Sequence, residues 1–187
     1  MLESGVGVLQ IRNKGLWTRE VLEQAEHVAG LCKAAGAALI VDDRADIALL
    51  LGAGLHVGQE DLPPAEARPL IGADTILGYS THNERQLIEA AGEPVSYVAL
   101  GPMFVTSSKA NPDPVVGVEG LARWRNLTQR PLVAIGGITR GNALRVSEAG
   151  ADSVAVIGDL LPDECSAASI RARMMDWRRT IGPPTQQ

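Results

Sequence analysis

The sequence predicts an α/β protein, a (β/α)8 barrel of the TIM type that lacks its first strand. Three observations carry this prediction. Short apolar runs alternate with amphipathic stretches along the chain, as in α/β folds. The runs lack clean polar–apolar alternation, which is typical of parallel strands buried on both faces. Polar residues gather just after nearly every run, and barrels build active sites at the carboxyl ends of their strands.

Seven apolar runs, rich in Val, Ile, Leu and Ala, are expected to be strands. Residues 1–5 look like the end of a helix, so we expect the chain to begin inside the first βα unit. The alternation also fits an open doubly wound sheet, but no GxGxxG motif follows the first run, which disfavours a dinucleotide-binding sheet. The expected strands are residues 6–11, 38–41, 55–57, 75–78, 97–100, 132–135 and 154–157.

Helices are expected between these strands. The clearest one covers residues 18–35, where Thr18 suits an N-cap, Glu20 favours the positive helix start and Gly36 ends the pattern. The other expected helices are a short one through residues 49–51 and those over residues 63–71, 83–91, 118–127, 141–149 and 167–179.

Length and composition limit the class of protein. The 187 residues suit one domain, which we expect over residues 1–181, with residues 182–187 as a disordered tail. A net charge of -5 and 3% aromatic residues argue against a nucleic-acid-binding surface. Cys32 and Cys165 are isolated, as expected of packed, reduced thiols. No apolar run approaches the ~20 residues of a membrane span, and no signal-peptide pattern begins the chain, so we expect a cytoplasmic protein.

Gln10, Arg12 and Lys14 leave the first expected strand at alternate positions. A period of two places them on one side of an extended chain. Two cations and an amide donor at a barrel mouth suit an anionic ligand, because Arg offers phosphate a bidentate fork. The alternative is a solvated strand end.

Three carboxylates follow the next two strands. Asp42 and Asp43 end one of them, and Asp61 lies in the string HVGQED. Carboxylates from neighbouring strand ends can converge on Mg2+, which keeps water and substrate phosphates as its other ligands. Alternatively, Asp43 pairs with Arg44 or caps the short helix, and Asp61 caps the helix at Pro63.

Two later loops also suit phosphate. Thr106, Ser108 and Lys109 lie in the long loop FVTSSKANPDPVVG, and such loops are often functional. The string AIGGITRGNA places glycines between a strand and a helix start, where main-chain N–H groups can approach an anion. Barrels commonly bind phosphate with the loops after their last two strands, here near Gly137 and Gly158. A tight turn without a ligand is the alternative.

Single histidines and hydroxyls carry less information. Ser80 or Thr81 suits a cap for the following helix. His82 is expected at the surface or as a capping residue, and His56 packed and hydrogen-bonded within its strand. No role is assigned to His27.

Together these residues resemble the thiamin phosphate synthase family. The strings QIRNK, VDDRADIAL, HVGQED, GYSTHN, GPMFVTSSK, VAIGGI and GADSVAVI occur in the family's order between residues 5 and 160. The resemblance implies a (β/α)8 barrel enzyme that joins a pyrimidine methyl diphosphate to a thiazole phosphate. Thiamin phosphate and diphosphate are the products, a pyrimidine carbocation forms early, and Mg2+ and cations stabilise the leaving group.

The resemblance also implies roles for individual residues. Arg12, Lys14 and Lys109 are the implied catalytic cations, with Gln10 beside them on the diphosphate. Asp43 and Asp61 are the implied Mg2+ ligands. The implied substrate-binding residues are Gln10, Asp42, Ser80, Thr106, Ser108, Gly137, Ile157 and Gly158.

Departures from the family pattern concern the same regions. Asp42 stands where the family has Asn, and its carboxylate would repel diphosphate unless a metal or Lys14 compensates. Ser108 in place of Thr keeps a hydroxyl, whereas Gly158 in place of Ser removes a phosphate donor. The family's first strand and most of its first helix are absent, and the unpaired edges of such a barrel invite pairing.

Two alternatives to a synthase stay open. One is a thiazole tautomerase, which shares the barrel and the phosphate site. The other is a non-catalytic barrel that binds phosphorylated ligands, which Asp42 and the missing strand favour. The intact GQED string and Lys109 favour the synthase. The sequence leaves the oligomeric state open, a homo-oligomer included.

Overall fold

The computed structural model describes residues 1–106 and 113–182. Seven parallel strands alternate with helices in these ranges, which confirms the predicted fold class and number of strands. Contacts divide the chain into two compact units. The N-terminal unit holds Leu2–Ser80 and Glu93–Ser96, and the C-terminal unit holds Thr81–Gly92, Tyr97–Gln187 and Met1.

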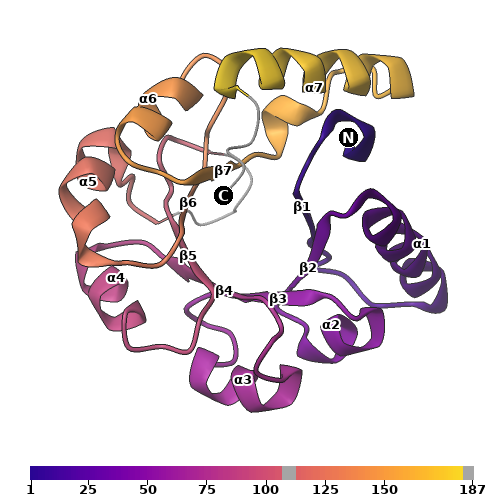
Figure 1. Ribbon diagram of the computed structural model, residues 1–187, viewed down its shortest axis with the longest axis horizontal. Coiled ribbons are helices and arrows are strands. Elements are labelled where there is room, and N and C mark those ends of the chain that lie inside the picture. Colours follow the sequence, from indigo (N-terminus) through magenta and orange to yellow (C-terminus); the bar gives the residue numbers. More distant parts are fainter. Residues whose placement is uncertain (107–112, 183–187) are drawn as a thin grey trace. The chain divides into compact units, whose positions relative to one another are not determined.

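The N-terminal unit pairs its strands in chain order, with Val8 beside Ala38, Ile40 beside Gly54, and Leu55 beside Leu77. Its helices lie on the outer side of these strands (Figure 1). All four β3 residues are buried, as expected of a parallel strand covered on both faces. The elements are η1 Leu2–Ser4, β1 Val8–Ile11, α1 Arg19–Ala35, β2 Ala38–Asp42, α2 Ala45–Leu51, β3 Gly54–Val57, α3 Pro64–Ile71 and β4 Leu77–Thr81, whose last residue, Thr81, belongs to the C-terminal unit.

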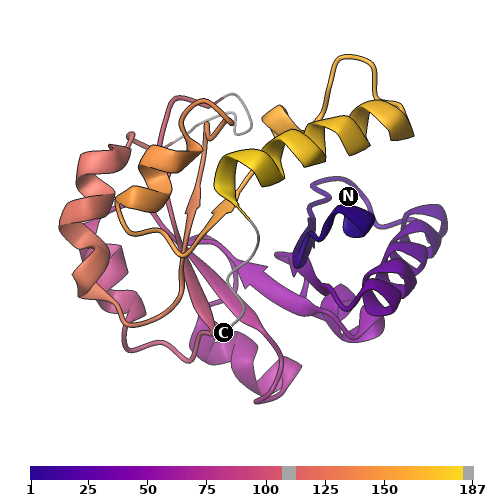
Figure 2. The same ribbon diagram turned by 45° about the horizontal axis from the view of Figure 1, so that its top comes forward.

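The C-terminal unit pairs β5 with β6 and β6 with β7, again in parallel. Figure 2 shows its helices α4, α5 and α6 along one side of these strands. The peptide bond Gly101–Pro102, just after β5, is cis. The elements are α4 Glu84–Ala90, β5 Tyr97–Leu100, α5 Gly117–Trp124, η2 Arg125–Leu127, β6 Leu132–Ile135, α6 Ala143–Glu148, β7 Ser153–Ala155, η3 Gly158–Leu160 and α7 Ala167–Ile181.

Helix α1 confirms the predicted caps. The Thr18 hydroxyl accepts a hydrogen bond from the Val21 N–H at 3.4 Å, and Gly36 ends the helix in the left-handed conformation with φ 68°. Cys32 is buried on this helix as predicted, whereas Cys165 is exposed, so the prediction of a packed thiol was wrong there. Burial raises the pKa of the Cys32 thiol.

Strand β4 was predicted too early in the chain. It covers Leu77–Thr81 rather than residues 75–78, so Ser80 and Thr81 lie in the strand and cap no helix. Asn83 caps α4 instead, because its side-chain oxygen accepts the Gln86 N–H at 3.0 Å. The Thr75 hydroxyl donates to the Ile71 carbonyl at 2.6 Å and so belongs to the end of α3.

The described chain begins with a short turn and ends just after a helix. The expected helix end at residues 1–5 is the short 3-10 turn η1. Gly182 follows α7, and residues 183–187 lie outside the described residues, so the single domain and the disordered tail stay predictions. Within the described ranges, no helix is long and apolar enough to cross a membrane.

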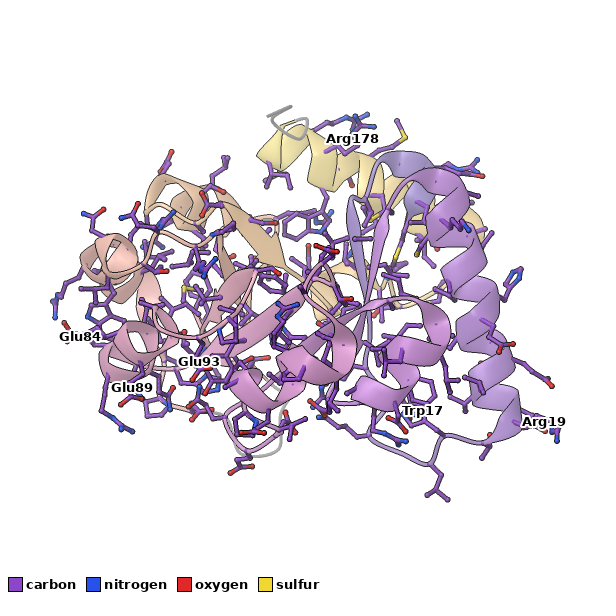
Figure 3. The ribbon with its side chains drawn as sticks, turned by 60° about the horizontal axis from the view of Figure 1, so that its bottom comes forward. Trp17, Arg19, Glu84, Glu89, Glu93 and Arg178 are labelled. Atoms are coloured by element: carbon purple, nitrogen blue, oxygen red, sulfur yellow. The ribbon has the colours of Figure 1, made fainter. Side chains whose placement is uncertain are left out.

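Arg68→Ala is expected to destabilise the fold by about 2–3 kcal/mol. The half-buried guanidinium donates to the carbonyls of Pro94, Gly72 and Thr75 at 2.6–3.0 Å, which ties α3 to the segment before β5. Urea unfolding checks this value. The matched control is Arg85→Ala, whose exposed partner Glu89 on α4 is labelled in Figure 3, and it should change stability by less than about 0.5 kcal/mol. Equal losses in both variants would contradict the prediction.

Candidate active site

The N-terminal unit gathers five of the predicted residues in one cluster, here called the cation–carboxylate cluster: Gln10, Arg12, Lys14, Asp42 and Asp43. The Gln10 amide donates to Asp42 Oδ1 at 3.2 Å. Arg12 Nε and Lys14 Nζ lie 3.2 and 3.3 Å from Asp42 Oδ2, and Lys14 also pairs with Asp43. The side chains that alternate from Gln10 in β1 onward therefore meet Asp42, the last residue of β2, and Asp43, which follows it.

The two cations of this cluster reach solvent while their shared anion does not. The side chains of Arg12 and Lys14 are 43% and 50% exposed, and that of Asp42 is 10% exposed. Arg12 and Lys14 both pair with the covered Asp42 carboxylate, so Lys14 offsets the negative charge of Asp42.

Asp43 has an unusual backbone. It is the one non-glycine residue with positive φ in the described ranges, at 63°, and its N–H donates to the His56 carbonyl at 2.8 Å. Such conformations cluster at functional sites. The alternative roles for Asp43 were wrong, because Arg44 pairs with Asp46 and α2 has no side-chain cap.

The segment after β3 brings further polar groups to the same unit. Asp61 Oδ2 accepts the Gly58 N–H at 2.7 Å, and Pro63 rather than Asp61 stands at the N-cap of α3. The Gln59 amide donates to the Ser80 carbonyl at 2.6 Å. Gln59 belongs to the GQED string, but its residue type and position alone predict no role for it.

His56 is packed and hydrogen-bonded, as predicted. Its side chain is buried in β3, and its Nε2 lies 2.8 Å from the Ser80 hydroxyl oxygen. Burial lowers the pKa of His56, while the charges of Asp42 and Asp61 act in the opposite direction. Burial therefore favours the neutral imidazole, and the contact of Nε2 with the Ser80 hydroxyl orients that side chain.

This lowered pKa predicts a stability change with pH. The unfolded chain binds a proton at His56 near pH 6.5, whereas the folded chain does so only at lower pH. The contribution of the neutral His56 to the free energy of unfolding should thus be fully present above pH 6.5. It should fall as the pH drops below 6.5, by up to about 1.4 kcal/mol per pH unit. Urea unfolding from pH 7.5 to 5 measures this slope. His56→Gln should reduce this slope, whereas His27→Gln, on the exposed side of α1, should leave the slope unchanged. A slope in His56→Gln equal to that of the parent chain would argue against this role of His56.

The carboxylates fit a magnesium ion in part. Asp43 and Asp61 offer oxygen ligands within one unit, and Mg2+ needs only one or two carboxylates when phosphates and waters complete its shell. No group of three or more His, Cys, Asp or Glu side chains within residues 1–106 and 113–182 is arranged to hold a metal by itself. Asp43 and Asp61 are thus the two predicted metal ligands that this unit offers.

The C-terminal unit brings together the glycine loop after β6 and the segment after β5. A Cβ at Gly136 would lie 2.6 Å from Pro102 Cβ, and one at Gly137 would lie 2.6 Å from the Val105 carbonyl. Both glycines also have positive φ, at 95° and 64°. Close packing of the two segments thus explains the glycines, a reason that the sequence pattern did not reveal.

Main-chain donors remain available on two loops of this unit. Among the described residues, neither the Gly137 N–H nor the Gly158 N–H donates to a protein acceptor. A Cβ at Gly158 would meet open space, and Ile157 beside it is 51% exposed. These donors suit the phosphate of a ligand.

The other predicted residues belong to the loop after β5 and the segment after β4. Thr106 is the last described residue before the gap, and Ser108 and Lys109 lie outside the described residues. His82 is partly buried, with Nδ1 2.7 Å from the Gly101 carbonyl and Nε2 3.6 Å from Asp113.

Comparison with known proteins identifies the family. A model of the family "Thiamine monophosphate synthase" matches residues 1–160. The chain belongs to this family. Membership confirms the resemblance and makes the chain a transferase of thiamine biosynthesis.

Individual relatives agree with this assignment. A thiamine-phosphate synthase of Koribacter versatilis is 49% identical over 170 residues, which are 90% of this chain and 80% of the relative. A thiamine-phosphate synthase of Synechococcus sp. is 43% identical over 91% of this chain, which spans only 48% of that relative. The solved thiamine phosphate pyrophosphorylase of Pyrococcus furiosus superposes with a TM-score of 0.83 at 33% identity, covering 96% of this chain and 84% of its own.

Proposed function

We propose that this chain joins 4-amino-2-methylpyrimidine-5-methyl diphosphate to a thiazole phosphate, giving thiamin phosphate and diphosphate. In this reaction the C–O bond between the pyrimidine methylene carbon and the diphosphate breaks, and the oxygen keeps the electron pair. The same carbon then forms a C–N bond with the thiazole nitrogen. The observation that carries the proposal is the cation–carboxylate cluster, in a chain that belongs to this family.

Arg12 and Lys14 hold the departing diphosphate in this proposal. Their half-exposed side chains can contact phosphate oxygens while Asp42 keeps them in place from below. Charge that develops on the leaving group is best stabilised by donors fixed beforehand, because no reorganisation is then needed during the reaction. Gln10 adds a neutral amide donor, and Lys109 adds a third cation by its place in the sequence.

Charge balance explains why a metal ion belongs in the proposal. Arg12 and Lys14 carry two positive charges, and Asp42 and Asp43 carry two negative charges, so these four side chains have no excess positive charge for a diphosphate. Asp43 and Asp61 would hold Mg2+, which would offset the negative charge of the leaving group. The Asp42 carboxylate strengthens this requirement relative to the Asn of the family pattern.

The other substrate groups are assigned to the remaining predicted residues. The thiazole phosphate binds to the N–H groups of Gly137 and Gly158, which have no protein acceptor among the described residues, and to the backbone at Ile157. Ser80, oriented by His56, and Thr106 and Ser108 contact the pyrimidine and diphosphate. A cytoplasmic location is part of the proposal, because the proposed substrates are soluble metabolites.

Growth of a thiamin-requiring bacterium tests the proposed function. A strain that lacks its own synthase but makes both substrates should grow without thiamin when it expresses this chain. Lys14→Ala should fail to restore growth, and Lys33→Ala, on the exposed last turn of α1, should restore it fully. Folded, well-expressed protein that restores no growth would contradict the proposal and favour a tautomerase or a binding protein.

A further inference from the structure

An ion pair in the C-terminal unit joins the loop after β6 to the loop after β7. Asp159 accepts hydrogen bonds from the Arg140 main-chain N–H at 3.2 Å and from Arg140 Nε at 2.9 Å. The Asp159 side chain is mostly covered, at 17% exposed, and the Arg140 side chain is one-third exposed. Neither residue belongs to the strings that carry the family resemblance.

Helix α7 braces this pair from a third element. Arg173 donates to the Asp159 main-chain carbonyl at 2.6 Å, and Asp176 lies 3.3 Å from Arg140 Nη1. Arg140 and Asp159 are thus held on more than one side. A pair that is fixed in this way can transmit the position of one loop to the other.

The joined loops carry the free donors described above. Gly137 lies three residues before Arg140, and Gly158 directly precedes Asp159. Neither glycine has a side chain through which its loop could be anchored. The Asn142 side chain braces the first loop internally, since it accepts the Thr139 N–H at 2.8 Å and donates to the Gly137 carbonyl at 3.1 Å. Arg140 and Asp159 therefore provide the side-chain link between the two loops.

We propose that Arg140, acting through Asp159, is a positioning residue that sets the spacing of the Gly137 and Gly158 donors for a phosphate monoester. The inference rests on the proposed function for the identity of that ester, the thiazole phosphate. In this role Arg140 does not contact the reacting atoms. Loss of the pair should weaken phosphate binding without affecting the diphosphate substrate.

The same unit contains a matched control pair at the opposite ends of these strands. Arg125 lies 2.9 Å from Asp152 Oδ2, which also accepts the N–H of Leu132 at 2.8 Å. This pair therefore joins the segments that precede β6 and β7. Arg125→Gln removes this Arg–Asp pair, together with the hydrogen bonds of Arg125 to the Gly150 and Thr128 carbonyls, without touching the loops that carry Gly137 and Gly158.

Calorimetric titration of metal-free protein tests the proposal with inorganic phosphate and with the thiazole phosphate separately. Arg140→Gln and Asp159→Asn should each weaken binding of both ligands about tenfold, because a misplaced donor loses much of its effect. The double variant should weaken binding by much less than the product of the two single effects, because both changes break the Arg140–Asp159 pair, although each also removes one further contact, with Asp176 or with Arg173. Arg140→Lys should fall in between, and Arg125→Gln should bind as the parent chain does.

Steady-state kinetics adds a measurement that a loss of stability would not reproduce. In Arg140→Gln the KM for the thiazole phosphate should rise about tenfold, with the KM for the pyrimidine diphosphate unchanged. Unaltered phosphate binding in Arg140→Gln, or a parent chain that binds neither ligand, would overturn the inference. A third outcome separates the two proposals. If the parent chain binds inorganic phosphate but not the thiazole phosphate, and Arg140→Gln still weakens phosphate binding, the inference is upheld and the proposed substrate is refuted.

Discussion

Lys14→Ala is expected to lower kcat/KM about a thousandfold, the size of effect seen when a fixed donor to developing charge is lost. Lys14 contacts both carboxylates of the cluster, Asp42 and Asp43. Its removal leaves two negative charges and only Arg12 to receive a diphosphate. The loss should therefore combine weaker binding of the pyrimidine diphosphate with poorer stabilisation of the leaving group.

Two measurements make this result specific. Steady-state kinetics with each substrate varied in turn should show the larger change for the pyrimidine diphosphate. Urea unfolding should show little loss of stability, because half of the Lys14 side chain is exposed. Lys33→Ala, the same substitution on the exposed last turn of α1, should keep full activity. A loss of activity within twofold for Lys14→Ala would remove this residue from the leaving-group site.

Asp43→Asn should raise the Mg2+ concentration for half-maximal activity about a hundredfold, the upper end of the losses seen when a metal ligand's surroundings are disturbed. The substitution removes a charged oxygen ligand but suits the local backbone, because Asn tolerates the left-handed conformation that Asp43 adopts at φ 63°. The fold should thus be preserved, and the change in metal requirement can be attributed to the ligand itself.

A magnesium titration of the initial rate measures this effect. Asp61→Asn should shift the titration in the same direction, since Asp61 is the second proposed ligand. Asp46→Asn is the control, because Asp46 is 61% exposed and pairs only with its neighbour Arg44 among the described contacts. Identical titration curves for Asp43→Asn and the parent chain would show that Asp43 does not bind the metal.

Features that depend on nearby residues could be predicted from the sequence. The ends of α1 follow from Thr18 and Gly36, whose preferences act within one turn of the helix. The convergence of Gln10, Arg12 and Lys14 follows from the period of an extended chain. Their meeting with Asp42 follows from the parallel order of neighbouring strands, whose carboxyl ends share one edge.

Features that depend on distant contacts could not be predicted. The position of β4 along the chain depends on its pairing with β3, and the sequence alone placed the strand too early, so that Ser80 and Thr81 fell beyond its predicted end. The packing of Gly137 against Val105 and the pair of Arg140 with Asp159 join segments that are 32 and 19 residues apart in sequence. Their residue types alone give no sign of such partners. The neutral state of His56 likewise depends on burial, which the strand pattern suggests but does not quantify.

Product formation by the purified chain tests the central claim most directly. The chain is mixed with the pyrimidine diphosphate, the thiazole phosphate and Mg2+, and the product is oxidised to its fluorescent derivative and identified by mass. Parallel mixtures lack Mg2+ or one substrate. We predict thiamin phosphate in the complete mixture alone, with one diphosphate released for each molecule formed. Well-folded protein that binds both substrates but yields no thiamin phosphate would contradict the proposed reaction.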